Sequence, residues 1–197
     1  VNLVSPTHYL PWIIAALDRV RGELKIPIVY NSGGYETVET VKMLEGYVDV
    51  FLPDLKYFDE DLSLKYSAAK DYFKVASSAI LEMFKQVGKV QLDDSGIIKK
   101  GVIIRHLTLP NARADTFKIM EWIAGNFPQN EILVSVMSQY TPFFHSGEFK
   151  EISRRISTFE YNSVIEKVND LGLKGFMQAK SSAKEEYTPD FNLEGIF

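Results

Sequence analysis

The chain repeats one pattern, in which a short apolar segment is followed by turn residues and then by apolar positions at helical spacing. The short segments are rich in β-branched residues and do not alternate with polar positions, which is typical of strands buried on both faces. The segments between them place apolar residues three and four positions apart, as an amphipathic helix does. The predicted strands are residues 1–4, 26–30, 48–52, 102–107 and 132–137.

The first predicted helix begins at about residue 11. Further helices are predicted over residues 37–44, 115–126 and 163–171, and a long helix follows the third strand. The long helix has apolar or aromatic residues at helical spacing: Tyr72, Val75, Ala79, Ile80, Met83 and Val87. Residues 90–92 and 97–99 break the repeat, because they flank Asp93-Asp94-Ser95-Gly96 and so predict a hairpin.

This order of elements predicts an α/β fold, namely a partial (incomplete) TIM-like βα barrel with about five parallel strands plus a small hairpin. An open doubly wound sheet satisfies the same pattern. The dinucleotide-binding version of that sheet is disfavoured, because no GxGxxG follows the first strand. We expect one domain over residues 1–177 and a polar C-terminal tail over residues 178–197.

Composition narrows the function classes. The net charge of −4 argues against nucleic acid as a partner. No apolar run approaches the roughly 20 residues that span a bilayer, and the sequence does not open like a secretory signal. We therefore expect a cytoplasmic protein that binds no membrane. The chain has no cysteine, which excludes disulfides, thiol catalysis and cysteine-ligated iron–sulfur clusters on this chain.

The first residues give a further expectation. The first predicted strand begins at Val1 and reads as a core strand, so we expect that a preceding segment is missing and that the strand has an exposed edge. An exposed apolar edge invites pairing with another chain, so a dimer through this edge is possible, as is a tail segment that covers it.

Polar residues follow every predicted strand. Ligands of βα folds bind at the carboxyl ends of the strands. Asp54 and Lys56 are two positions apart and so share one face of a strand end, although a helix cap and a rim salt bridge would explain them as well. Arg105 and His106 are neighbours and point to opposite faces, so one of them is expected to be structural. The candidates are Ser5, Thr7, His8, Asn31, Ser32, Asp54, Lys56, Arg105, His106, Gln139 and Tyr140.

Several of these segments, taken in order, resemble radical S-adenosylmethionine proteins of the pyruvate formate-lyase activating enzyme type, in the branch whose substrates are unassigned. The resemblance extends over essentially the whole chain and includes the tail segment Tyr187-Thr188-Pro189-Asp190-Phe191. Its main segments are Asn2-Leu3-Val4-Ser5-Pro6-Thr7-His8, Pro27-Ile28-Val29-Tyr30-Asn31-Ser32-Gly33-Gly34-Tyr35-Glu36, Asp49-Val50-Phe51-Leu52-Pro53-Asp54-Leu55-Lys56-Tyr57, Arg105-His106-Leu107-Thr108-Leu109-Pro110 and Gln139-Tyr140-Thr141-Pro142.

The resemblance implies a six-strand partial barrel in which a CxxxCxxC loop after the first strand holds a 4Fe-4S cluster. S-adenosylmethionine binds the cluster and is cleaved to a deoxyadenosyl radical, which acts on a glycyl-radical-type protein or a small-molecule substrate. Aligned in this way, the present chain begins at the family's second strand and lacks the cluster segment. We therefore expect this chain alone to be inactive and to carry neither cofactor.

The resemblance also implies which residues contact S-adenosylmethionine. Ser5 and Thr7 lie where the family has Gly-Gly-Glu, which holds the methionine amino group, and Thr7 departs from that pattern because it carries no charge. Asn31 and Ser32 match the strand end near the methionine or ribose. The other matches are Asp54 and Lys56, for the ribose hydroxyls and the methionine carboxylate, and Leu107 and Tyr140, which flank the adenine. No catalytic residue and no metal ligand is assigned.

Two other functions fit the same residues. One is a cluster-free βα-barrel lyase or hydrolase that uses Asp54, Lys56 and His106 as acids and bases. The other is a non-catalytic binding domain. A CxxxCxxC sequence upstream in the gene would favour the radical enzyme over both.

Overall fold

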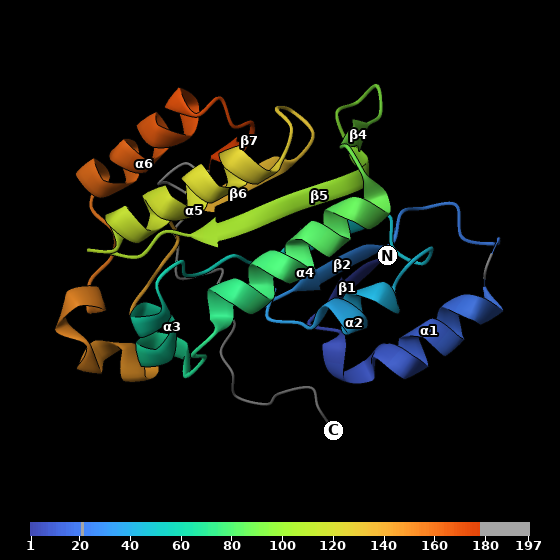
Figure 1. The fold of residues 1–197 in the computed structure, drawn as a ribbon, viewed down its shortest axis with the longest axis horizontal. Helices are drawn as coiled ribbons and strands as arrows, with labels where there is room; N and C mark the ends of the chain where they lie inside the picture. The colour runs from blue at the N-terminus through green and yellow to red at the C-terminus, as the bar shows by residue number, and fades with distance from the viewer. Residues whose placement is uncertain (21, 178–197) are drawn as a thin grey trace.

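A computed structural model of the chain describes residues 1–20 and 22–177. Its sheet holds six parallel strands in the order β1-β2-β3-β5-β6-β7 (Figure 1). Within the described residues β1 and β7 do not pair with each other, so the sheet stays open and the predicted partial βα barrel is confirmed. The strands are β1 (Asn2–Val4), β2 (Val29–Ser32), β3 (Val50–Pro53), β5 (Ile98–Leu107), β6 (Leu133–Met137) and β7 (Gly175–Met177). The predicted tail, residues 178–197, lies outside the described residues.

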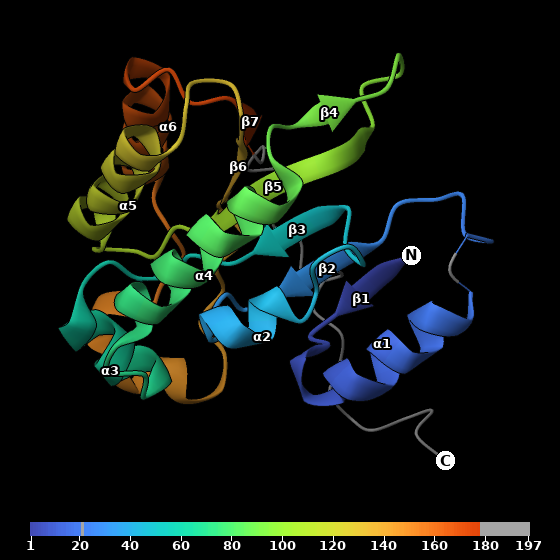
Figure 2. The same cartoon turned by 45° about the vertical axis from the view of Figure 1, so that its right-hand side comes forward.

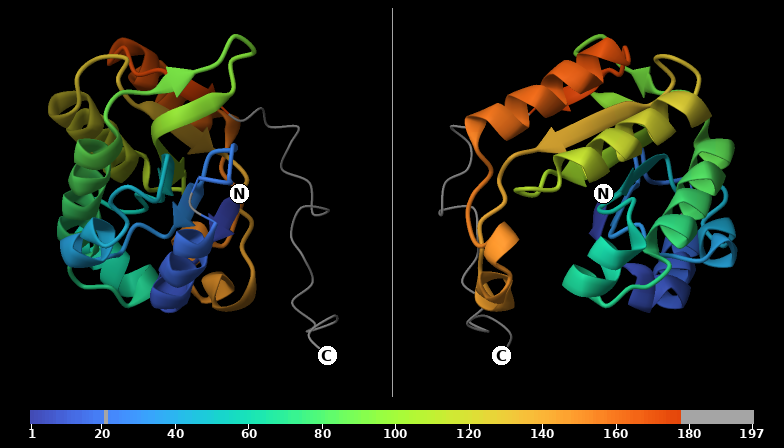
Figure 3. Two further views of the ribbon diagram at one scale, coloured as in Figure 1. Left: turned by 90° about the vertical axis from the view of Figure 1, so that its right-hand side faces the viewer. Right: turned by 60° about the vertical axis from the view of Figure 1, so that its left-hand side comes forward.

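Helices connect the strands and cover one face of the sheet, and Figure 3 shows the layers curving together along an arc. Among the described residues no helix has both the length and the apolar character needed to cross a membrane. Figure 2 shows the short helices η2 (Phe144–Glu148) and η3 (Lys150–Ile152), drawn in orange, beside α3 (Glu60–Ser67), near the carboxyl ends of the strands. The helices are η1 (Thr7–Tyr9), α1 (Leu10–Arg19), α2 (Val38–Lys42), α3 (Glu60–Ser67), α4 (Tyr72–Val87), α5 (Arg113–Asn126), η2 (Phe144–Glu148), η3 (Lys150–Ile152) and α6 (Thr158–Asp170).

The predicted hairpin is present and continues into the core. β4 (Gln91–Leu92) pairs antiparallel with the first part of β5, and the turn between them is closed by the Asp93 side chain, which accepts hydrogen bonds from Ser95 and Ile97. The sequence suggested separate strands at residues 97–99 and 102–107. They form one strand, because Gly101 takes a φ of +128° and lets the chain change direction without a break in pairing.

Three expectations about the elements were wrong. The sixth parallel strand, β7, was missed because it has only three residues and begins with a glycine, although Gly172, with a φ of +67°, marks the end of α6 before it. Helix α3 was missed because its apolar positions are few, although Asp59 caps its first turn by accepting from Asp61 and Leu62. β2 begins at Val29 and includes Asn31 and Ser32, which were expected to follow the strand.

Alternation along the strands separates a helix-covered face from an inner face. Ser32 and His106 are buried on the helix-covered face with the core residues Tyr30, Phe51 and Ile104. On the opposite, inner face Val50 and Ile103 are buried, but the side chains nearer the carboxyl ends of the strands are only half-buried. They are Asn31, Leu52, Asp54, Arg105, Leu107 and Met137. The fold therefore exposes polar groups of neighbouring strands on one concave surface.

In the described part of the chain, β1 is the first strand of the sheet and its outer edge has no strand partner, as expected. Leu3 lies opposite Tyr30 of β2. On either side of Leu3, the Val29 amide donates to the Val1 carbonyl and the Ser5 amide donates to the Asn31 carbonyl. The main-chain groups of Asn2 and Val4, between these positions, therefore face away from the sheet. The Val4 side chain is 64% exposed. Within the described residues no other strand pairs with this edge.

We predict that this edge mediates self-association. Val4→Lys should shift the protein toward monomer in light scattering coupled to size-exclusion chromatography, because a lysine on an edge strand opposes strand pairing. Leu92→Lys, at another exposed strand residue, is the matched control and should leave the mass unchanged. A wild-type protein that is monomeric at all concentrations, or a Val4→Lys dimer, would contradict the prediction.

Candidate functional site

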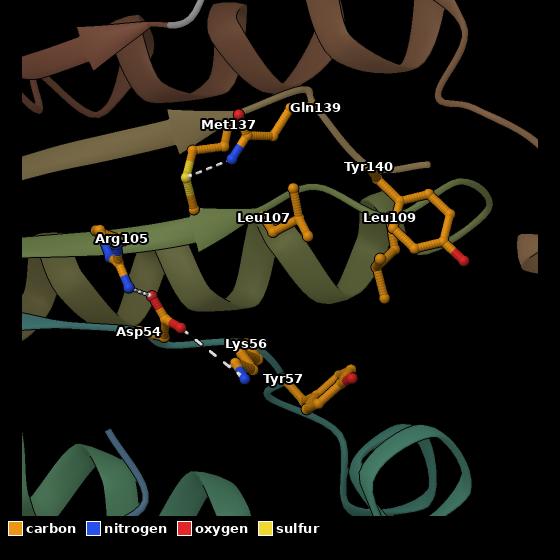
Figure 4. Close-up of a pocket in the computed structure, with 9 residues that line it drawn as sticks. All are labelled: Asp54, Lys56, Tyr57, Arg105, Leu107, Leu109, Met137, Gln139 and Tyr140. Atoms are coloured by element: carbon orange, nitrogen blue, oxygen red, sulfur yellow. Dashed lines mark hydrogen bonds and ion pairs between the residues drawn. The ribbon is translucent and has the colours of Figure 1, made fainter. Parts of the chain in front are cut away.

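A cavity of about 370 Å³ opens at the carboxyl ends of β3, β5 and β6 (Figure 4). This volume lies in the lower part of the range of small-molecule sites. The position is the one at which βα folds bind ligands. The lining residues are Asp54, Lys56, Tyr57, Arg105, Leu107, Leu109, Met137, Gln139 and Tyr140.

Three charged side chains meet at the base of the cavity. Asp54 and Arg105 face each other across β3 and β5, and the Asp54 Oδ1 to Arg105 Nη2 distance is 2.6 Å. Lys56 Nζ lies 3.9 Å from Asp54 Oδ2, at the limit of an ion pair, and its side chain is 45% exposed. Two cations thus share one carboxylate, so the site has an excess of positive charge. That excess favours a ligand with an anionic group.

Arg105 has unused hydrogen-bonding capacity. Its Nε is buried and makes no hydrogen bond with any described residue, and the contact of Nη2 with Asp54 Oδ1 is not directed as a hydrogen bond. A buried N–H group without an acceptor is unfavourable. The Arg105 side chain as a whole is 26% exposed and lines the cavity. This cation is therefore placed to meet an acceptor in the cavity.

The remaining wall is apolar and aromatic. Leu107, Leu109 and Met137 give aliphatic and thioether surface. Tyr140 donates from its hydroxyl group to the Ile152 carbonyl at 2.8 Å, and the Tyr57 hydroxyl lies 3.0 Å from Ser67 Oγ. Both rings are therefore held at the hydroxyl end, and a flat heterocycle could pack between ring and aliphatic surface.

The turn after β2 supports Asp54 from below. Gly34 has a φ of +76°, and a side chain at this position would overlap the Asp54 carbonyl oxygen. Ser32 Oγ accepts from the Gly34 amide at 3.3 Å, and the Asp54 amide donates to the Ser32 carbonyl at 3.0 Å. The Asn-Ser-Gly-Gly turn thus fixes the end of β3.

His106 is structural. It is 2% exposed, its Nδ1 lies 2.8 Å from the Leu55 carbonyl and its Nε2 lies 2.9 Å from Thr116 Oγ1. Because a carbonyl only accepts, Nδ1 carries the proton and Nε2 accepts from Thr116. Burial lowers the pKa of His106 to about 4. The expectation that one of the Arg105–His106 pair is structural is confirmed, and an acid–base role for His106 at the rim is wrong.

We predict an acid-sensitive stability that originates at His106. Its pKa is 6.5 when the chain is unfolded and about 4 when folded, so between these values the unfolded state binds more protons. Stability should therefore be unaffected above pH 6.5 and should fall by about 3 kcal/mol as the pH drops to 4. Urea unfolding of wild type and His106→Gln from pH 7 to pH 4 measures how the free energy of unfolding changes with pH in each protein. Equal pH dependence in both proteins would refute the assignment.

The residues predicted on β1 and β2 lie outside the cavity lining. Thr7 donates its only hydroxyl hydrogen to Glu36 Oε1, which also accepts from Tyr30. Ser5 is exposed, and its amide donates to the Asn31 carbonyl. Ser32 points to the helix-covered face. Of this group, Asn31 has its side chain on the inner face, where it makes no hydrogen bond with a described residue.

Four of the predicted contacts do line the cavity: Asp54, Lys56, Leu107 and Tyr140. Of the other lining residues, Arg105 and Gln139 were candidates but not predicted S-adenosylmethionine contacts, and Tyr57, Leu109 and Met137 were missed. Met137 could have been found by alternation along β6, since it lies beside Leu107 in the register. The described residues contain no cluster of three side chains suited to hold a metal ion.

Comparison with known proteins gives a fold and a distant relative. No protein family model matches the sequence. The chain is 32% identical over 169 residues to "Uncharacterized protein MJ0674" of Methanocaldococcus jannaschii; the match covers 84% of this chain and 45% of that protein. The chain therefore spans less than half of the length of this curated relative.

Among solved structures, the chain is similar to the crystal structure of a domain of pyruvate-formate lyase-activating enzyme from Bacteroides vulgatus, with a TM-score of 0.65. The match covers 91% of this chain and 98% of that domain, at 16% sequence identity. At this identity the likeness concerns the fold. The chain thus has the fold of a domain of that enzyme.

Proposed function

We propose that the cavity binds S-adenosylmethionine, and that this chain is the S-adenosylmethionine-binding part of a radical enzyme similar to pyruvate formate-lyase activating enzyme. The observation that carries the proposal is the placement of Asp54 and Lys56 next to Leu107 and Tyr140 in one cavity. The four residues were selected as S-adenosylmethionine contacts from the sequence, and they come from three separate segments.

The chemistry of the cavity suits this ligand. A ribose offers hydroxyl donors to the Asp54 carboxylate, and a methionine carboxylate offers acceptors to Lys56 or to the partly exposed guanidinium group of Arg105. An adenine ring fits against Leu107 and Tyr140. On this proposal Asp54 and Lys56 orient the nucleoside, and the apolar wall excludes water from one side of it.

The iron–sulfur cluster of such enzymes does not fit this chain. The 197 residues include no cysteine, and no group of described side chains replaces the thiolates. No redox step is therefore assigned to these residues. The proposal leaves cluster binding, the radical chemistry, and the protein or small-molecule substrate to the larger protein of which this chain would be a part.

Isothermal titration calorimetry of this chain tests the binding site: the chain is expected to retain no cofactor when isolated, but its cavity residues should bind ligand that is added. S-adenosylmethionine and S-adenosylhomocysteine should bind, 5′-methylthioadenosine should bind more weakly because it lacks the amino-acid group, and free methionine should not bind measurably. The proposal fails if no adenosyl compound binds, or if ATP binds more tightly than S-adenosylhomocysteine. For the larger protein, a CxxxCxxC sequence encoded upstream of Val1 would support the radical enzyme and its absence would contradict it.

A further inference from the structure

The main chain that carries Asp54 and Lys56 is bonded on three sides. The amide of Asp54 donates to the Ser32 carbonyl at 3.0 Å, and the amide of Leu55 donates to the Arg105 carbonyl at 2.8 Å. These two bonds continue the sheet toward β2 and β5. The amide of Lys56 lies beyond the sheet, and it donates to the hydroxyl group of Tyr72 at 3.0 Å.

Tyr72 is the first residue of α4 and is 3% exposed. Besides accepting from Lys56, its hydroxyl group lies 2.9 Å from the Asp54 carbonyl and 3.0 Å from the Gly33 carbonyl. A hydroxyl group has one hydrogen, so the two carbonyls share it. A single side-chain atom thus connects the turn after β2 with both ends of the segment 54–56.

Packing holds the Tyr72 ring in place. It stacks on Tyr35 with ring centroids 5.7 Å apart, and it meets the Tyr57 ring edge to face at 5.6 Å. Burial raises the pKa of Tyr72 above its usual range, so the hydroxyl group keeps its hydrogen at neutral pH. The ring itself does not line the cavity.

We propose that Tyr72 is the positioning residue of the cavity: its hydroxyl group fixes the Lys56 main chain so that the Lys56 side chain projects toward the ligand. Asp54 is held by the two neighbouring strands as well, whereas the Lys56 amide depends on Tyr72. Loss of the hydroxyl group therefore acts on ligand binding through Lys56. The effect on binding rests on the proposed function; the effect on the main chain does not.

Amide hydrogen exchange measured by NMR tests the main-chain part without a ligand. In Tyr72→Phe, the Lys56 amide should exchange at least tenfold faster than in wild type, while the Asp54 and Leu55 amides keep their rates. Tyr66→Phe is the matched control, because it removes another tyrosine hydroxyl group, on a half-buried ring and bonded to Glu151, and should change none of the three rates. Equal acceleration of all three amides in Tyr72→Phe would overturn the proposal.

A double-mutant cycle with S-adenosylhomocysteine tests the binding part. Tyr72→Phe should weaken binding by about threefold to tenfold. In a Lys56→Ala background the same change should have little further effect, because the group that it positions is absent. Additive losses would overturn the proposal. If wild type does not bind this compound, the proposed function fails and the exchange experiment alone decides the role of Tyr72.

Discussion

Replacing Gly34 with alanine is expected to lower the free energy of unfolding by about 2–5 kcal/mol. The residue has a φ of +76°, a region that L side chains adopt at a cost. An alanine methyl group would also overlap the Asp54 carbonyl oxygen, which cannot move freely because it is bonded to Tyr72. The turn or the end of β3 must therefore shift.

Gly33 provides the control for this prediction. No atom lies within 4 Å of the position where its side chain would be, and its φ is not in the left-handed region. Gly33→Ala should change stability by less than about 1 kcal/mol. Urea unfolding of both variants measures the difference. Similar stability of Gly34→Ala and Gly33→Ala would show that the close approach to Asp54 does not constrain the turn.

Gly34→Ala should also affect the cavity. Because Gly34 contacts the Asp54 main chain, Gly34→Ala should displace both charged residues of the segment 54–56 and weaken binding of any ligand in the cavity. Asn31 and Ser32 of the Asn-Ser-Gly-Gly turn were expected to contact the ligand. The structure gives the turn a supporting role instead: Ser32 and Gly34 shape the end of the neighbouring strand.

The architecture could be predicted because strands and helices leave strong local patterns. Buried strands such as β3 and the central part of β5, residues 102–104, are continuous apolar runs, and α4 repeats its buried positions every three or four residues. β7 could not be predicted in this way. Its three residues owe their conformation to pairing with β6, a contact between distant parts of the chain that no local pattern records.

The site was predictable to the extent that strand order decides it. The strands β3, β5 and β6 are neighbours in the sheet. Asp54 and Lys56 follow β3, Leu107 ends β5 and Tyr140 follows β6, so the four side chains share a cavity. Thr7 follows β1, but its hydroxyl group is taken by Glu36. The sequence does not reveal such a side-chain pairing. The Asp54–Arg105 pair was missed for the same reason, since it depends on the register between β3 and β5.

Replacing Lys56 with alanine is expected to weaken binding of S-adenosylmethionine by about tenfold or more, with little change in melting temperature. A charge-assisted contact with a carboxylate contributes about 1.5–3 kcal/mol, which corresponds to that loss in affinity. In the unbound protein Lys56 Nζ lies 3.9 Å from Asp54 Oδ2 and its side chain is 45% exposed, so the ion pair adds at most about 1 kcal/mol to stability. Arg105 makes the closer contact with Asp54 and keeps this carboxylate paired when Lys56 is absent.

Calorimetry with two ligands separates this role from a general loss of positive charge. Lys56→Ala should weaken S-adenosylhomocysteine but not 5′-methylthioadenosine, which has the same nucleoside and no carboxylate for Lys56 to contact. Lys56→Arg should retain most of the affinity, and Lys85→Ala, which removes the same charge from an exposed position on α4, should retain all of it. If Lys56→Ala binds both ligands as wild type does and its melting temperature falls, then Lys56 stabilises the fold through Asp54 and does not contact the ligand.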